Sequence, residues 1–124
     1  PDYPEAKRRN MKAAIYLAEH LHEAPVHLFV AGWTRRSAPQ SQALFPAIQN
    51  VLLACRAVGL GASLTTAHRA HGEAIDRFLG LDPVKTPSIA LIPIGWPKGR
   101  FGTPTRRSID TCFFEDAVPE GVLS

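Results

Sequence analysis

The sequence predicts one domain that combines helices with a β-sheet, in the α+β or α/β class. Three helical and about three strand segments alternate along its 124 residues. The two clearest strands carry apolar residues on both faces, which indicates a sheet that is covered on each side. Three strands are few for such a sheet, so we expect more chain or a partner to complete it.

The first predicted helix spans residues 5–23, a stretch without proline or glycine. Apolar side chains recur along it at the spacing of one helical face, namely Ala14, Leu17, Ala18 and Leu21. Pro25 ends this helix, because the residue before a proline is pushed out of the α region. Residues 26–31 then alternate as a strand, and the polar residues 34–42 predict a loop.

The second predicted helix, residues 43–58, is apolar on nearly every side. A helix of this kind is buried all round, which places it centrally in the domain or between subunits. Gly59 supplies its stop, and residues 60–67 follow as a short β-like segment.

The last elements are a third helix within residues 68–81 and a strand over residues 87–97. The helix places Ile75, Phe78 and Leu79 on one face and stops at Gly80. The strand is apolar on both faces. Glycine and proline then break the pattern, so residues 97–124 are predicted to form an extended arm.

The charge balance and the apolar pattern exclude several broad classes of protein. The 14 basic and 11 acidic side chains give a formal net charge of +3, but the basic residues cluster near the two ends and form no stripe with interleaved aromatics. We therefore expect no nucleic-acid partner. No apolar run reaches the roughly 18 to 20 residues that span a bilayer, and the first residues lack a secretory signal. We expect a cytoplasmic protein that does not enter a membrane.

Several candidate sites fail on spacing or order. His20 and His22 are two residues apart on the first helix, so they point in different directions, and we expect no metal site. The glycine-rich LGLGAS follows a helix and enters a strand, the reverse of the order in phosphate-binding loops. No G-x-S-x-G motif is present, which disfavours hydrolase chemistry.

Two basic pairs keep alternative interpretations. His68 and His71 follow the end of a predicted strand, where α/β sheets gather ligands, so they either contact a substrate or flavin or are surface charge. Arg106 and Arg107 are adjacent in an extended segment, where guanidinium groups suit phosphate binding, although arginines in a tail are also commonly solvated. The residues alone leave both alternatives open.

Three segments of the sequence resemble the C-terminal part of the nitroreductase-like flavoprotein family. They are LAEHLHEAPVHLFV, LFPAIQNVLLACRAVGLGASLTTAH and ALIPIGWPKGRFGTPTRRSIDTCFF. In that family a long buried helix with an A-x-Q-N-x-L-L-A-A pattern leads through G-x-G into a strand, and a later P-x-G-Y/W-P motif precedes a basic tail. This sequence carries these features in the same order.

The resemblance implies an α+β fold with helices flanking the sheet, and an FMN-dependent oxidoreductase. Such a protein works as an intertwined homodimer with flavin at the subunit interface. Electrons from NAD(P)H would pass as hydride through flavin N5 to a nitroaromatic, a quinone or a similar small-molecule acceptor.

The resemblance also implies where flavin and substrate bind, and it assigns no catalytic side chain. The flavin-edge segment falls on Leu64, Thr65, Thr66 and Ala67. Backbone N–H groups there would stabilise the negative charge that hydride adds to the ring. The loop near His68 would contact the substrate. The phosphate contacts fall on Arg106 and Arg107, with Arg107 favoured because many members carry a basic residue where this chain has threonine.

The chief departure from the family is a missing N-terminal segment. Members usually begin with an arginine-rich R-x-S-x-R segment that grips the phosphate, and the RRSAPQ run at residues 35–40 follows the first strand instead. We therefore expect residues 1–124 to be the C-terminal half of a single nitroreductase-like domain, either naturally short or lacking the rest. The alternatives are a truncated, redox-inactive module that binds flavin or another phosphate ligand, and a structural subunit that dimerises through residues 43–58.

Overall fold

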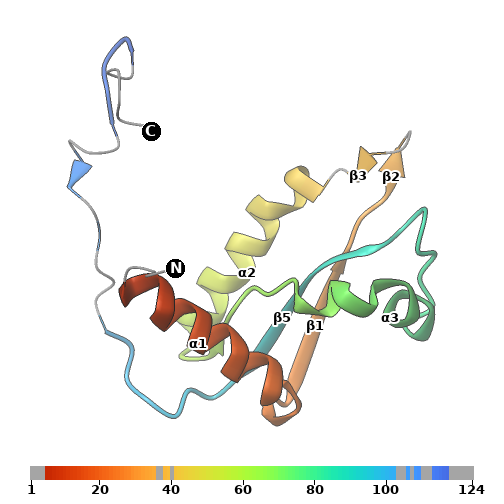
Figure 1. Cartoon of the computed structure of the whole chain (residues 1–124), viewed down its shortest axis with the longest axis horizontal. Helices are drawn as coiled ribbons and strands as arrows, with labels where there is room; N and C mark the ends of the chain where they lie inside the picture. Colours follow the sequence, from red (N-terminus) through yellow and green to blue (C-terminus); the bar gives the residue numbers. More distant parts are fainter. Residues whose placement is uncertain are drawn as a thin grey trace.

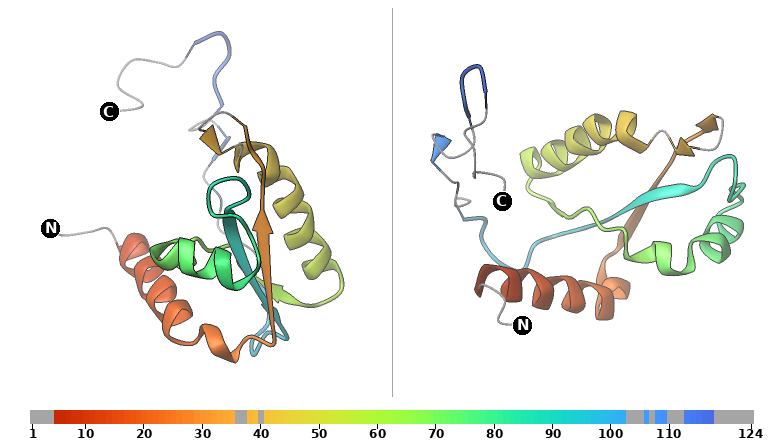
Figure 2. Two further views of the ribbon diagram at one scale, coloured as in Figure 1. Left: turned by 90° about the vertical axis from the view of Figure 1, so that its right-hand side faces the viewer. Right: turned by 45° about the horizontal axis from the view of Figure 1, so that its top comes forward.

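The computed structural model of the chain describes residues 5–35, 38–39, 41–102, 106, 108–109 and 113–117. Its elements form three layers, with a small sheet as the middle layer (Figure 1). Helix α2 (Phe45–Ala57) covers one face, whereas α1 (Glu5–Glu19) and α3 (Gly72–Phe78) lie on the other, as both views of Figure 2 show. Each predicted helix is therefore present, and together they flank the sheet.

The sheet consists of β1 (Val26–Ala31), β4 (Gly61–Ala62) and β5 (Ser88–Gly95), in the order β1-β5-β4. Both pairings are antiparallel. The last strand in sequence therefore lies in the centre of the sheet. The α+β class is confirmed, because a doubly wound α/β sheet would need parallel neighbours.

The hydrophobic core lies between α2 and the central strand. Ile48 of α2 packs against Ala90 and Ile92 of β5, and these three residues are 2% exposed or less. Leu91, whose side chain points to the opposite face of the sheet, is equally buried. Both faces of β5 are covered, as the apolar pattern of residues 87–97 predicts.

The predicted strand over residues 60–67 is much shorter in the structure, and Pro93 explains why. β4 ends at Ala62, and beyond it only an isolated bridge joins Thr65 to Leu91. This bridge keeps the register of the β4–β5 pairing, so Ser63 lies opposite Pro93. Because proline has no N–H to donate, the ladder is interrupted at that pair.

The connection from α1 to β1 contains a short 3₁₀-helix. A 3₁₀-helix (Leu21–Glu23) follows α1, and the ring Nε2–H of His27 donates to the carbonyl oxygen of Leu21 at 2.8 Å. The α-helix therefore ends at Glu19, four residues before the predicted end at residue 23, and the 3₁₀-helix takes up most of the chain that remains before Pro25.

Glycine ends both of the later helices, as the sequence predicts. Gly59 after α2 and Gly80 after α3 have φ values of +83° and +74°. After α2 the N–H of Leu60 donates to the carbonyl oxygen of Cys55 at 2.8 Å, which is the hydrogen bond of a Schellman motif. A side chain with a Cβ would be strained at either glycine.

The expectation of a loop over residues 34–42 is wrong for most of its described part. Two short strands, β2 (Thr34–Arg35) and β3 (Ala38–Pro39), pair antiparallel as a separate sheet, and a 3₁₀-helix (Ser41–Leu44) leads into α2. Residues 36–37 and 40 lie outside the described residues. The prediction fails because a two-residue strand pairs through its backbone and needs no apolar alternation.

Helix α2 is buried on one side only within this chain. Ile48 and Cys55 face inward, whereas Phe45, Leu53 and Val58 are exposed. The prediction of burial on every side is thus not met by the described residues alone. Among the described residues, no helix or strand lies against the outer face of α2 in any of the views (Figures 1 and 2).

After β5 the chain runs along the end of the sheet and then away from it (Figure 1). Residues 96–102 are irregular. Two contacts tie them to the body: Lys98 pairs with Glu23 at 3.3 Å, and the Arg56 guanidinium lies 3.6 Å from the ring centre of Phe101. Among the described residues, no helix is long and apolar enough to cross a membrane.

Candidate functional site

Residues 64–67, the predicted flavin-edge segment, lie at the edge of the sheet between β4 and a 3₁₀-helix (Ala67–His71). The Leu64 side chain packs against the core cluster. Thr65 and Leu91 exchange two backbone hydrogen bonds of 2.9 Å. The N–H of Ala67 donates to the Thr65 hydroxyl oxygen at 3.2 Å. The segment is therefore fixed to β5 from its first residue.

The backbone N–H of Thr66 points away from the sheet. The carbonyl of Thr65 accepts from Leu91 and so points toward β5. In a trans peptide the N–H of the next residue points the opposite way, which directs the Thr66 N–H outward. Thr66 is exposed, and its N–H has no acceptor within the described part of the chain. This N–H is a fixed donor open to a ligand.

A buried polar cluster holds the elements that follow this segment. Asp76 of α3 is fully buried, and its Oδ1 accepts hydrogen bonds from the N–H of Ser88, at 2.9 Å, and from the Ser88 hydroxyl. The other oxygen, Oδ2, accepts from Arg69 at 3.1 Å. Arg69 also donates to the carbonyl oxygen of Ser88 at 2.9 Å. The three residues join the 3₁₀-helix, α3 and β5.

Asp76 stays ionised in this cluster. Burial by itself would raise the pKa of the carboxyl, but the hydrogen bonds from Ser88 and the Arg69 guanidinium outweigh it and lower the pKa below its usual range. Each oxygen has at least one donor, which satisfies the buried charge.

This cluster corrects the predicted orientation of the third helix. The expected inner face of Ile75, Phe78 and Leu79 is wrong, because Phe78 is 89% exposed and Asp76 lies inside. Phe78 is two residues from Asp76, so it points to nearly the opposite side of the helix. The hydrogen bonds to Ser88 decide which side faces the sheet.

His68, the predicted substrate contact, is buried in this chain. The whole residue is 6% exposed. Its ring packs edge-on against the Phe29 ring of β1, with the two ring centroids 5.7 Å apart. Neither ring nitrogen has a hydrogen-bond partner within the described residues. Burial lowers the pKa of His68, and the nearby Arg69 charge adds to this, while the Ser88 backbone and Asp76 partly offset it. The imidazole is neutral near pH 7.

Of the two predicted phosphate ligands, the structure describes only Arg106. Arg106 is exposed on the arm, and Arg107 lies outside the described residues. Figure 1 shows the described parts of the arm beyond residue 102 extending away from the sheet edge that carries residues 64–67.

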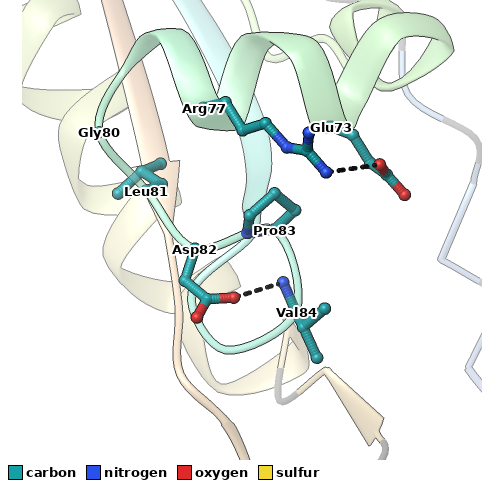
Figure 3. A pocket seen from close by; sticks show the side chains of 7 residues that line it. All are labelled: Glu73, Arg77, Gly80, Leu81, Asp82, Pro83 and Val84. Carbon is teal, nitrogen blue, oxygen red and sulfur yellow. Dashed lines mark hydrogen bonds and ion pairs between the residues drawn. The ribbon is translucent and has the colours of Figure 1, made fainter.

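A hollow of about 570 Å³ lies elsewhere, at the end of α3 (Figure 3). Its charges are already paired: Arg77 with Glu73 at 3.4 Å, and Asp82 with the backbone N–H of Val84 at 2.9 Å. A second hollow of about 330 Å³, beside Ser63, includes Trp96 and Phe101 in its wall. Within the described residues, no group of three or more His, Cys, Asp or Glu side chains could hold a metal ion.

A sequence model of the nitroreductase family matches residues 2–96. The chain belongs to the nitroreductase family. No curated protein and no solved structure matches it. The matched range includes residues 64–68 and ends before Arg106 and Arg107.

Membership in the nitroreductase family places the protein among flavin-dependent oxidoreductases in general. Members generally bind FMN and are typically dimeric. The outward N–H of Thr66 lies in the matched range and fits a flavin ring, which needs hydrogen-bond donors at its edge.

Sequence reasoning missed the Arg69, Asp76 and Ser88 cluster. Asp76 lies four residues after Gly72, and both are buried on one side of α3, but an aspartate at a helical spacing normally indicates a solvated face. The partner, Ser88, is 12 residues further along the chain. No local pattern could have joined them.

Proposed function

We propose that this nitroreductase-family protein is an FMN-dependent oxidoreductase that passes hydride from NAD(P)H to a nitroaromatic, a quinone or a similar small acceptor. The observation that carries the proposal is the fixed, outward N–H of Thr66, which has no acceptor among the described residues, in the segment that the family resemblance assigns to the flavin edge. When bound, FMN supplies the redox chemistry.

The chain's own residues have a simple role in this proposal. The Thr66 N–H donates to the ring edge where negative charge develops, and it needs no reorganisation because Leu91 holds the Thr65 carbonyl. Leu64 anchors the segment in the core. Thr65 and Ala67 hold its turn through the hydrogen bond from N–H to hydroxyl.

His68 is proposed to lie at the inner wall of the acceptor site. Neither ring nitrogen has a hydrogen-bond partner among the described residues, and burying such a group unpaired costs free energy. A bound molecule or a second subunit would supply a hydrogen-bond partner. This role requires the imidazole to be reached from the side of residues 64–67.

Arg106 and Arg107 are proposed to bind the FMN phosphate within a homodimer. The described parts of the arm extend away from their own sheet, which is compatible with a contact between the arm and flavin held by a second copy. The exposed Phe45 and Leu53 of α2, and Val58 directly after it, support this dimer, since exposed apolar side chains favour burial by a partner.

The test uses the complete natural chain, purified and saturated with FMN. We expect a yellow protein that oxidises NADH or NADPH once a quinone or nitroaromatic is added. Flavin binding without turnover would favour the redox-inactive module instead. A protein that binds no FMN would overturn both.

A backbone change tests the Thr66 donor itself. Replacing Thr66 by the matching α-hydroxy acid turns its N–H into an ester oxygen and leaves the side chain in place. Loss of one donor to a charged acceptor costs about 1.5 to 3 kcal/mol, so we expect the two-electron potential of bound FMN to fall by roughly 30 to 60 mV. Thr66→Ala, which keeps the N–H, is the matched control and should leave the potential unchanged.

A further inference from the structure

Arg69 is placed to do more than compensate a buried charge. Its side chain is 42% exposed, yet its guanidinium reaches the fully buried Asp76 and the carbonyl oxygen of Ser88. These contacts span the 3₁₀-helix, α3 and the first residue of the central strand. Arg69 therefore docks the 3₁₀-helix onto the sheet.

The backbone of the same residue closes the turn after the flavin-edge segment. The N–H of Arg69 donates to the carbonyl oxygen of Thr66 at 2.9 Å. Leu91 holds the N–H and carbonyl of Thr65 on the other side. The peptide that carries the Thr66 N–H is thus fixed by β5 before it and by Arg69 after it.

Gly72 shows how closely the guanidinium is packed. A Cβ at this position would lie 2.8 Å from both Cζ and Nη1 of Arg69. The guanidinium rests on the backbone of α3 and has no room to shift toward that helix. Because Asp76 is ionised and buried, movement of Arg69 away from it would leave the carboxylate charge uncompensated.

We propose that Arg69 is a positioning residue that fixes the orientation of the Thr66 N–H, and through it the affinity and potential of the bound flavin. Arg69 acts through the backbone of residues 65–66 and through its contacts with Asp76 and Ser88. This inference rests on the proposed function, since the ligand of the Thr66 N–H is the flavin ring.

The experiment compares Arg69→Met with Arg77→Met in the complete natural chain. Methionine keeps the length of the side chain and removes its charge and donors. Arg77 is the matched control, because it belongs to the neighbouring helix and pairs only with the exposed Glu73 among the described residues. The two measurements are amide hydrogen exchange without flavin, and the FMN dissociation constant with the flavin potential.

In Arg69→Met we expect faster exchange at the amides of Thr65 and residue 69, and a rise in the FMN dissociation constant on the order of tenfold. Arg77→Met should match the wild type in both. The exchange measurement needs no turnover, so it reports the position of the segment directly.

A second variant guards against loss of folding. Arg69→Met combined with Asp76→Asn removes the buried charge and keeps an acceptor for Ser88, so the carboxylate is no longer uncompensated. The same faster exchange and weaker FMN binding in this folded variant would support the proposal.

The outcomes separate the two ideas. Wild-type protein that binds FMN, with Arg69 variants that match it in exchange, affinity and potential, would overturn the positioning role and leave the proposed function standing. Wild-type protein that binds no FMN would overturn the proposed function and this inference together.

Discussion

At the scale of single residues, Asp76 decides how α3 lies on the sheet. Its carboxylate takes donors from Ser88 and Arg69, and each such hydrogen bond to a charged group is worth about 1.5 to 3 kcal/mol. Burial of Phe78 would gain a similar amount of about 1.5 to 3 kcal/mol. The helix cannot bury both sides against one sheet, and the several donors on Asp76 outweigh one aromatic side chain.

Gly72→Ala tests the packing of Arg69. Alanine in a helix normally stabilises by about 1 kcal/mol relative to glycine. Here the added Cβ would lie 2.8 Å from the guanidinium carbon, so we expect a loss of about 1 to 3 kcal/mol in the free energy of unfolding. Urea denaturation measures it.

The control for this substitution is Gly99→Ala, where a Cβ meets nothing within 4 Å. In an Arg69→Met background the sign should reverse, and Gly72→Ala should stabilise by about 0.5 to 1 kcal/mol. A destabilising Gly72→Ala in that background would show that the clash does not involve Arg69.

His68 predicts a pH dependence of stability. Burial lowers its pKa in the folded protein below the ordinary value of 6.5, with Arg69 adding to the effect and Asp76 opposing it. Between the two pKa values the unfolded chain binds more protons, so the free energy of unfolding falls as pH falls below about 6.5. Above that value the effect is absent, because the ring is neutral in both states.

His68→Phe removes this titration and keeps a ring against Phe29, so the slope of stability between pH 6.5 and 5 should become shallower. His71→Phe, at an exposed position three residues on, is the control and should keep the slope. Urea midpoints across this pH range give the comparison. Equal slopes in wild type and His68→Phe would contradict the assignment.

At the scale of elements, a single proline in the central strand β5 shortens the neighbouring strand β4. The register places Ser63 opposite Pro93, and the missing N–H splits one expected strand into the two residues of β4 and the lone bridge at Thr65. Pairing resumes at Thr65, and the chain then leaves the sheet at Thr66, just before the 3₁₀-helix of residues 67–71.

Pro93→Val should repair the ladder. Valine restores the N–H opposite Ser63 and fits a strand, so we expect its amide to exchange as slowly as that of Leu91. Hydrogen exchange followed by NMR measures both amides in one sample. Fast exchange at residue 93 would mean that the edge segment lies out of hydrogen-bonding register there.

Much of the element order could be predicted from the sequence, for identifiable reasons. Pro25, Gly59 and Gly80 set boundaries through the backbone alone, and the apolar run of β5 indicates a strand covered on both faces. The short strands within residues 34–39 could not be predicted, because they pair through backbone groups without an apolar pattern.

At the scale of the whole molecule, the described chain leaves large apolar side chains exposed on several elements. They include Ile15 and Tyr16 on α1, Leu53 and Val58 around α2, and Phe78 on α3. A folded monomer exposes some apolar side chains, but this many on helices that flank so small a sheet favours a partner. The homodimer of the proposed function would cover the outer face of α2.

Leu53→Glu tests that surface. A charge buried without a partner at an interface costs at least about 2 kcal/mol, so the dissociation constant of the dimer should rise roughly thirtyfold. Sedimentation velocity over a concentration series measures it. Val84→Glu puts the same charge on an exposed apolar residue of the loop after α3 and should leave the dimer intact. A dimer unaffected by Leu53→Glu would exclude this face of α2.

The sequence by itself determined the three helices, the two long strands and a fold class of α+β or α/β, because these depend on local backbone preferences and on apolar spacing. The assignment of a flavin-edge segment came from the resemblance to the nitroreductase-like family. The tertiary structure alone decided the burial of Asp76 and His68, the break opposite Pro93 and the outward direction of the Thr66 N–H. Each of these depends on a contact with a residue at least 12 positions away in the chain, where no local pattern reaches.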